Sequence, residues 1–148
     1  MKYISHRGNL LGKNTDLENT TRYIWEALDK GFDVEIDVWV MDKVIFLGHD
    51  GPKSEVTPSF LNNQNIWCHA KNIEALNFLL DKELHCFWHE QDAFTITSHG
   101  YVWAYPSKDY SNNVIAVLPE KNGLHSDRLK HCAGICSDYV QMYKECID

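Results

Sequence analysis

Two histidines in the first third of the chain stand at the ends of short apolar runs, where a reactive site can form. His6 follows the apolar residues 3–4, and His49 follows the run V-I-F-L at 44–47. Histidine exchanges protons readily near neutral pH, so two of them can act as base and acid in one displacement. Arg7 adds a planar cation that suits phosphate oxygens. These residue types point to chemistry at a phosphate group.

Two carboxylates lie between the histidines, in the alternating run V-E-I-D-V at 34–38. If this run is a strand, its period of two places Glu35 and Asp37 on one face, about 7 Å apart. Bare carboxylates at that spacing repel in a low dielectric unless a cation, a basic side chain or open water lies beside them. A divalent metal ion is the simplest of these. A metal site with two histidines and an arginine indicates attack on a phosphodiester, although a lone histidine would indicate only a half-buried polar residue.

Four short motifs in this stretch resemble a known family. They are H-R-G at 6–8, E-N-T at 18–20, E-x-D at 35–37 and H-D at 49–50. In type and order they resemble the N-terminal signature of glycerophosphodiester phosphodiesterases and of the related phosphatidylinositol-phospholipase-C-like barrels. The resemblance implies a TIM-type barrel that cleaves phosphodiesters with the help of a metal ion. The rest of the chain matches these families more loosely.

The resemblance also implies a role for individual residues. His6 and His49 become the acid–base pair, without a decision on which is the base and which the acid. Glu35 and Asp37 become metal ligands, and Arg7 becomes a phosphate contact. The expected cofactor is therefore one divalent cation, Mg²⁺ or Ca²⁺ in the resembling families.

A second polar group follows the run N-I-W-C at 65–68. There the resembling families carry an acidic residue, one further residue and then lysine, whereas this chain has His69 and then Lys71. Histidine can bind the same ion but favours softer metals, so Mn²⁺ and Zn²⁺ are also candidate ions for this site. Glu90 and Asp92 stay open as alternative third ligands. By the resemblance, Lys71 becomes a second phosphate contact.

The sequence also leaves two further possible sites open. One is a structural zinc site, although no C-x-x-C or H-x-x-x-H spacing supports it. Its members would be Cys68, His69, Cys86 and His89. The other is a set of aromatic residues that either stack on a sugar or base or, more simply, fill the core of a small barrel. They are Trp88, Tyr101, Trp103 and Tyr105.

Hydrophobic periodicity predicts the elements that would position these residues. Residues 3–6 predict a strand, 17–30 an amphipathic helix that stops at Gly31, and 34–38 a second strand. A strand–helix–strand unit has parallel strands whose carboxyl ends share one edge of the sheet. That edge would carry His6 together with the two carboxylates.

The remaining chain predicts further strands and few helices. The expected elements are a return strand over 44–47, an external loop over 53–65, a strand over 65–68 with a helix over 73–81, strands over 84–88, 94–97, 101–105 and 114–118, a helix over 124–132 and a closing strand over 134–139. A usual (β/α)8 barrel has about 250 residues. This chain has 148. The predicted fold class is therefore α/β, as one domain over residues 1–148: a reduced, irregular TIM-type barrel that lacks some outer helices.

Composition and charge limit the class of protein and its partners. A hydrophobic content of 44% with 24% charged residues excludes disordered and fibrous classes. A net charge of −7 argues against a nucleic-acid surface, which needs clustered Lys and Arg. No apolar stretch approaches the ~18 residues of a membrane span, and no signal-peptide pattern opens the sequence, so a cytoplasmic protein is expected. Five irregularly spaced cysteines predict free thiols rather than disulfides. Apolar strand edges that a second subunit could cover make a homodimer an open alternative.

The function that the sequence predicts is hydrolysis of a glycerophosphodiester or a similar small phosphodiester, with one divalent cation and two histidines. An alternative is a catalytically degenerate barrel that binds a phosphorylated head group or sugar without cleaving it. Cleavage by a hydroxyl of the substrate itself, which yields a cyclic phosphate, uses the same residues, and the sequence does not separate it from hydrolysis.

Overall fold

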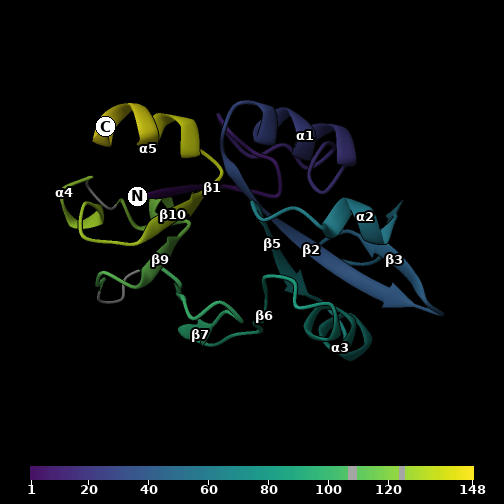
Figure 1. The fold of residues 1–148 in the computed structure, drawn as a ribbon. Helices are drawn as coiled ribbons and strands as arrows, with labels where there is room; N and C mark the ends of the chain where they lie inside the picture. The colour runs from purple at the N-terminus through teal and green to yellow at the C-terminus, as the bar shows by residue number, and fades with distance from the viewer. Residues whose placement is uncertain (107–109, 124–125) are drawn as a thin grey trace.

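The computed structural model describes residues 1–106, 110–123 and 126–148. Over these ranges the chain is a mixed α/β protein in which helices cover part of the outer side of one strongly curled sheet (Figure 1). Its strands are β1 (Lys2–His6), β2 (Asp33–Met41), β3 (Val44–Leu47), β4 (Ser54–Val56), β5 (Ile66–Ala70), β6 (Cys86–Trp88), β7 (Phe94–Ile96), β8 (Val102–Ala104), β9 (Val114–Val117) and β10 (Gly134–Ser137). Its helices are α1 (Thr21–Asp29), α2 (Pro58–Leu61), α3 (Ile73–Asp81), α4 (Ser126–Leu129), α5 (Val140–Ile147) and the 3-10 helix η1 (Pro119–Asn122).

Parallel strands form the body of the sheet. In the described part of the chain they follow one another around the curl in the order β6, β5, β2, β1, β10, β9 and β8. The antiparallel strands β3 and β4 extend the sheet from the second half of β2, and β7 pairs antiparallel with β8. The expected α/β class, with a hairpin after β2, is confirmed.

The curled sheet does not close into a barrel in the described part of the chain. No ladder joins β6 to β7 there, and single hydrogen bonds cross the junction instead. The Ser98 amide donates to the Cys86 carbonyl over 2.7 Å, and the Cys86 amide donates to Ser98 Oγ over 2.9 Å. β6 forms its ladder with β5, and β7 forms its ladder with β8. The expected barrel is therefore corrected to an open, curled sheet.

The helices lie where their sequences bury one apolar face. In α1, Ile24 and Ala27 are buried against the sheet, and Gly31 follows the helix with φ 80°, a left-handed conformation that glycine adopts without a steric penalty. Figure 1 shows α1, α3 and α5 outside the curl, where they contact β1, β2, β5 and β10. The described residues between β6 and β9 contain no helix. The described residues of this part of the fold thus include no outer helix, in line with the expected reduction.

Three segments differ from the expected elements. Residues 53–65 contain β4 and α2 rather than only an external loop, and Phe60 of α2 packs edge-on against Trp25 of α1 with ring centroids 5.9 Å apart. The helix expected over 124–132 is the shorter α4, and Leu124 lies outside the described residues. The helix α5, which packs on β1 and β10, has no counterpart among the expected elements.

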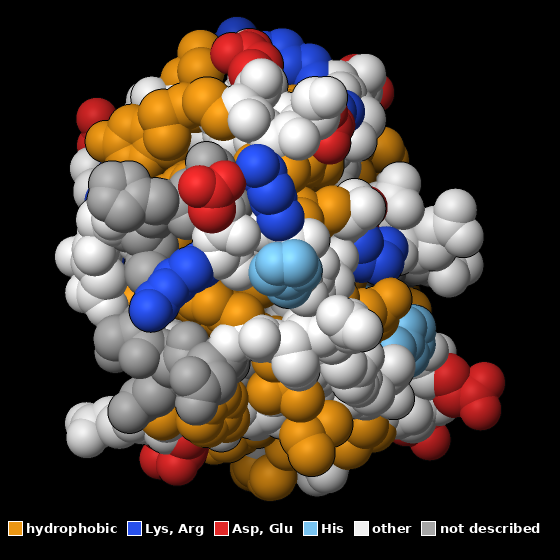
Figure 2. All heavy atoms as spheres, turned by 90° about the vertical axis from the view of Figure 1, so that its left-hand side faces the viewer, with side chains coloured by type: hydrophobic (Ala, Val, Ile, Leu, Met, Phe, Trp, Pro, Cys, Tyr) orange, Lys and Arg blue, Asp and Glu red, His pale blue; other side chains and the backbone are white. Residues whose placement is uncertain are grey.

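The surface is chemically mixed on the side that carries β9 and α4. Figure 2 shows basic, acidic and hydrophobic side chains interspersed there, without one continuous basic area. Among the described residues, no helix combines the length and the apolar character that crossing a membrane requires. The five cysteines are free, and only Cys146 is exposed.

Candidate active site

A cavity of about 260 Å³ opens at the carboxyl-terminal ends of the parallel strands. The seven residues of the predicted catalytic, metal and phosphate sites line it, except Asp37, whose side chain is fully buried beside the lining residues. The predicted residues in the lining are His6, Arg7, Glu35, His49, His69 and Lys71. The shared edge of parallel strands therefore brings together residues that lie far apart in the sequence.

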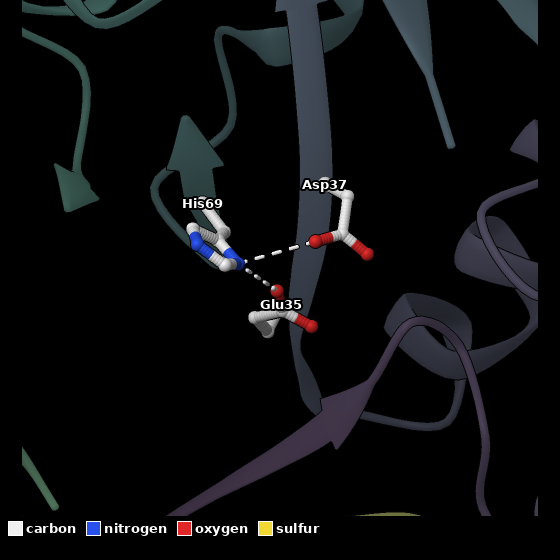
Figure 3. Close-up of side chains that lie close together, drawn as sticks. All are labelled: Glu35, Asp37 and His69. Atoms are coloured by element: carbon white, nitrogen blue, oxygen red, sulfur yellow. Dashed lines mark ion pairs between the residues drawn. The ribbon is translucent and has the colours of Figure 1, made fainter. Parts of the chain in front are cut away.

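Three buried side chains converge beside this cavity. Glu35 and Asp37 project from β2, and His69 reaches them from β5, where it is the direct neighbour of Asp37 in the ladder (Figure 3). His69 Nδ1 lies 3.1 Å from Asp37 Oδ1 and 3.8 Å from Glu35 Oε1. One ligand atom from each residue lies within 4.8 Å of the other two. This group could hold a metal ion.

Two oxygens of the group are buried without a hydrogen-bond donor among the described residues. They are Glu35 Oε2, which lies 3.9 Å from His6 Nε2, and Asp37 Oδ1, which has ion-pair contacts with His69 and Lys71. Burying such oxygens without a hydrogen bond is unfavourable, and a cation would satisfy both. Two carboxylates with one imidazole suit Mn²⁺ or Zn²⁺, and the carboxylates also suit Mg²⁺. The donor set therefore fits one divalent cation.

The two carboxylates differ in their affinity for protons. Burial, followed by the neighbouring Asp37 charge, raises the pKa of Glu35 well above its ordinary value. Burial also opposes ionisation of Asp37, but the surrounding basic side chains, first of all His69, outweigh it and lower the pKa of Asp37. A cation bound here would favour the ionised form of both carboxylates.

A backbone contact fixes the orientation of His69. Its Nε2 lies 2.9 Å from the carbonyl oxygen of His89, which can only accept a hydrogen bond, so Nε2 carries a proton. The ring of Phe87 stacks on His69 with centroids 4.9 Å apart. Nδ1 is therefore held toward the carboxylates, as is usual for a histidine that binds a metal.

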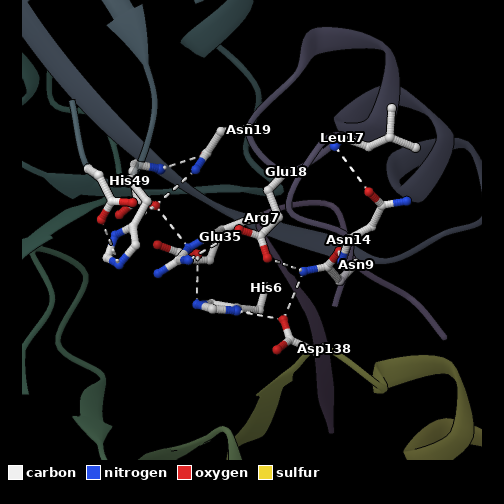
Figure 4. Close-up of polar contacts among 12 residues, drawn as sticks. His6, Arg7, Asn9, Asn14, Leu17, Glu18, Asn19, Glu35, His49 and Asp138 are labelled. Carbon is white, nitrogen blue, oxygen red and sulfur yellow. Dashed lines mark hydrogen bonds and ion pairs between the residues drawn. The ribbon is translucent and has the colours of Figure 1, made fainter. Parts of the chain in front are cut away.

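His6 is oriented by Asp138, a residue for which the sequence predicted no role. His6 Nδ1 lies 2.7 Å from Asp138 Oδ1, and Asn9 Nδ2 donates to the same oxygen over 2.8 Å (Figure 4). Burial opposes ionisation of Asp138, but the contact with His6 outweighs it and lowers the pKa of Asp138. The ionised Asp138 accepts a hydrogen bond from His6 Nδ1–H, which leaves His6 Nε2 on the side of Glu35, whose Oε2 is 3.9 Å away.

Arg7 lies among carboxylates, beside the three side chains that could hold a metal ion. Its Nε is 3.0 Å from Asp37 Oδ2, and its NH1 donates to Glu18 Oε2 over 3.3 Å. Asn19 holds Asp37 through two bonds: its Nδ2 donates to Asp37 Oδ2 over 2.9 Å, and its Oδ1 accepts from the Asp37 amide over 3.0 Å. Arg7 and Asn19 both have φ 57°, a conformation that non-glycine residues adopt when their surroundings enforce it. The E-N-T motif thus supplies the partners of Arg7 and Asp37.

His49 and Lys71 lie toward the open side of the cavity. His49 exposes 43% of its side chain, and its Nδ1 is 3.8 Å from Asp37 Oδ2 and 3.4 Å from Lys71 Nζ. Lys71 Nζ is in turn 3.6 Å from Asp37 Oδ1. Burial, followed by the charge of Arg7, lowers the pKa of His49. The structure therefore brings both residues beside the three side chains that could hold a metal ion.

The structure also separates the alternatives that the sequence left open. Glu90 lines the cavity and Asp92 does not, and neither belongs to the three-residue group that could hold a metal. Cys68 and Cys86 pack in the hydrophobic core, and Cys68 faces away from its neighbour His69 because side chains alternate along β5. Within the described ranges, the alternative zinc site is therefore not assembled.

Comparisons of this chain with family models, with curated proteins and with solved structures find no match. The residues of this cavity and their geometry are therefore what indicates a function.

Proposed function

We propose that this protein is a metal-dependent phosphodiester hydrolase that acts on a small phosphodiester such as a glycerophosphodiester. The observation that carries the proposal is the convergence of three kinds of group around one cavity: a cation-binding triad, two histidines and two basic side chains. Binding a phosphate without cleaving it requires no pair of proton-transfer groups. We further infer that the curled sheet is an opened, reduced form of a TIM-type barrel, a fold in which the carboxyl-terminal edge of the strands is the usual place for such a site.

Glu35, Asp37 and His69 would hold one divalent cation, which when bound supplies Lewis-acid polarisation of a phosphoryl oxygen. The surrounding contacts keep these ligands in place. Asn19 holds Asp37 through two hydrogen bonds, and the His89 carbonyl fixes the ring of His69. Partners of this kind orient metal ligands and maintain affinity for the ion.

His6 is the general base in this proposal, and His49 is the general acid. A carboxylate that holds Nδ1–H leaves the Nε2 lone pair of His6 free to accept a proton from an attacking water molecule. His49, on the open side of the cavity, protonates the leaving alcohol. Arg7 and Lys71 stabilise negative charge on the phosphate oxygens.

Hydrolysis of bis(4-nitrophenyl) phosphate tests this function. The purified protein is stripped of metal ions and resupplied with Mg²⁺, Ca²⁺, Mn²⁺ or Zn²⁺, alongside the variants His6→Ala and Glu35→Ala. We expect turnover that a metal restores and that both substitutions abolish, whereas Glu55→Gln, at an exposed position of β4, keeps the wild-type rate. If a divalent ion binds through Glu35 but no metal restores turnover, a barrel that only binds a phosphorylated head group or sugar replaces the hydrolase.

A further inference from the structure

Side chains rather than a ladder hold the junction between β6 and β7 where β6 begins. There, residues 84–86 contact residues 97–99. His85, the residue before β6, makes two of these contacts. Its Nε2 lies 2.9 Å from Thr97 Oγ1, and its ring stacks on that of His99, with centroids 4.1 Å apart and planes 14° apart. Two histidines thus lie face to face across the position where the curled sheet is open.

His85 is held neutral in this junction. The residue is only 7% exposed, and its ring also packs on Trp67, with centroids 4.0 Å apart. Burial, followed by the charges of His99 and Lys2, lowers the pKa of His85 to about 3. His99 covers His85 from the exposed turn between β7 and β8. Hydrating a positive charge on His85 therefore requires that the contact with His99 opens.

The charged groups around His85 do not balance a positive charge on it. Lys2 of β1 is itself a cation. Asp33 of β2 is already paired with Lys2 over 3.2 Å, and it accepts a hydrogen bond from the Trp67 indole over 3.0 Å. The other titratable groups around His85 in the described part of the chain are Cys68, Cys86 and Tyr101, none of which is a carboxylic acid. A protonated His85 would therefore lack a counter-charge in the closed junction.

We propose that His85, covered by His99, makes this junction an acid-operated closure, in which protonation of His85 opens the junction and releases the hairpin of β7 and β8 from β6. A cation on His85 is repelled by a charged His99 in the closed state, whereas water hydrates both rings once the junction is open. The hairpin carries Trp103, and Tyr105 follows it; both line the cavity. Acid would thereby remove one wall of the cavity, whatever reaction the cavity catalyses.

Proton linkage sets the size of the effect. In the closed junction, His85 stays neutral down to about pH 3, whereas in the open junction it is solvated and regains the ordinary histidine pKa of 6.5. Between these two values the open state binds one more proton, so its population should rise by about tenfold for each pH unit of acidification. From pH 7.5 to pH 4.5 the expected rise is about 10²-fold.

Hydrogen exchange of two backbone amides measures this opening directly. The Ser98 amide donates to the Cys86 carbonyl over 2.7 Å, and the Cys86 amide donates to Ser98 Oγ over 2.9 Å, so both are released when the junction opens. We expect their protection factors, corrected for the intrinsic effect of pH on exchange, to fall by about 10²-fold between pH 7.5 and pH 4.5. In His85→Phe, which keeps a ring between Trp67 and His99, they should change by less than about threefold.

Two controls separate local opening from general loss of structure. His131→Phe removes an exposed histidine in the turn after α4 and should keep the wild-type fall. The Cys68 amide, which donates to the His85 carbonyl over 2.9 Å between β5 and the start of β6, should lose much less protection than the Ser98 amide.

The proposal is overturned if wild-type protection of the Ser98 amide does not depend on pH, if His85→Phe shows the wild-type fall, or if the Cys68 amide loses protection in parallel. Should His85→Phe fail to fold, His99→Glu at the exposed turn decides. It places a carboxylate against His85 in the closed state, so the fall should be at least about threefold smaller than in the wild type. An unchanged fall in His99→Glu overturns the proposal.

Discussion

At the scale of single residues, the orientation of His6 depends on Asp138. Asp138→Asn keeps the size of the side chain but removes the charge that holds Nδ1–H, so the amide can stabilise the wrong tautomer of His6. We expect kcat for bis(4-nitrophenyl) phosphate to fall by about 10²-fold or more, with little change in KM. Steady-state kinetics over a range of pH measures both parameters.

Asp16→Asn is the matched control for this substitution, because Asp16 is exposed in the loop after β1. It should keep the wild-type kcat and the wild-type pH profile. A wild-type kcat in Asp138→Asn would contradict the orienting role of Asp138.

The proposed roles of His6 as base and His49 as acid predict that the rate depends on the leaving group. A nitrophenolate leaves without a proton, whereas an alkoxide requires one. His49→Ala should therefore lower the rate by less than about tenfold for a nitrophenyl leaving group and by about 10²-fold or more for an alkyl leaving group. His6→Ala should lower both rates strongly. Equal losses for the two leaving groups in His49→Ala would show that His49 is not the general acid.

The rule that parallel strands share their carboxyl edge predicted which residues meet. His6, Glu35 and His69 each occupy a strand of this sheet, so their convergence could be read from the sequence. Asp138 could not be assigned a role, because it lies 132 residues from His6 and its only signal was an acidic residue after a short apolar run. Asn19 was recognised as part of a motif, but its bonds to Asp37 depend on a backbone conformation that no pattern specifies.

At the scale of elements, Asn72 connects three parts that position the site. Its side chain accepts hydrogen bonds from the Val40 amide over 3.2 Å and from the Ala75 amide over 3.1 Å, and it donates to the Val40 carbonyl over 2.7 Å. It thereby caps α3 and ties the end of β2 to the chain that leaves β5. Asn72→Ala should lower the free energy of unfolding by about 1–2 kcal/mol, measured by urea denaturation.

Asn62→Ala is the control for the capping variant, because Asn62 is exposed at the end of α2. Its effect should stay within about 0.5 kcal/mol. An equally small loss in Asn72→Ala would show that the three bonds of Asn72 contribute little net stability.

Elements were predictable where the hydrophobic period extends over several turns. The helix expected over 73–81 is α3 with the same bounds, and the helix expected over 17–30 contains α1. β4 and α2 were missed because three and four residues do not establish a period of two or of 3.6. Their position depends on tertiary contacts such as Trp25 with Phe60, which are not encoded locally.

At the scale of the whole molecule, buried charge links stability to pH. The folded state raises the pKa of Glu35 above the ordinary value of 4.5, through burial and then through Asp37. Ionising Glu35 therefore destabilises the metal-free fold increasingly as pH rises above that value. In the presence of a chelator, Glu35→Gln should be more stable than the wild type at pH 8, by about 1–3 kcal/mol, and this advantage should shrink toward pH 5.

A bound cation should reduce this advantage of Glu35→Gln. At a Mn²⁺ concentration 100 times its dissociation constant, the wild type gains about 2.7 kcal/mol, and Glu35→Gln should gain less because it lacks one charged ligand. Thermal unfolding with and without Mn²⁺ measures both effects. Lower stability of Glu35→Gln in chelator at pH 8 would contradict the raised pKa of Glu35, and equal stabilisation by Mn²⁺ would contradict its role as a ligand.

The overall architecture was predictable in part. The length of the chain predicted a reduced structure, and the described residues between β6 and β9 indeed contain no helix. Closure of the sheet could not be predicted, because it depends on the junction of β6 with β7. There, a few bonds from residues such as Ser98 replace a ladder, and three-residue strands carry too little pattern to show this in advance.

In the proposed hydrolase, phosphodiester cleavage in this cavity requires one divalent cation, held by Glu35, Asp37 and His69. The most direct measurement titrates Mn²⁺ into metal-stripped protein while recording bound Mn²⁺, by the electron paramagnetic resonance signal of the free ion, and hydrolysis of bis(4-nitrophenyl) phosphate on the same samples. We expect one bound ion per chain, a rate that rises in proportion to the bound ion, and loss of both in Asp37→Asn. Hydrolysis that does not follow bound Mn²⁺, or binding and turnover that survive in Asp37→Asn, would contradict the claim.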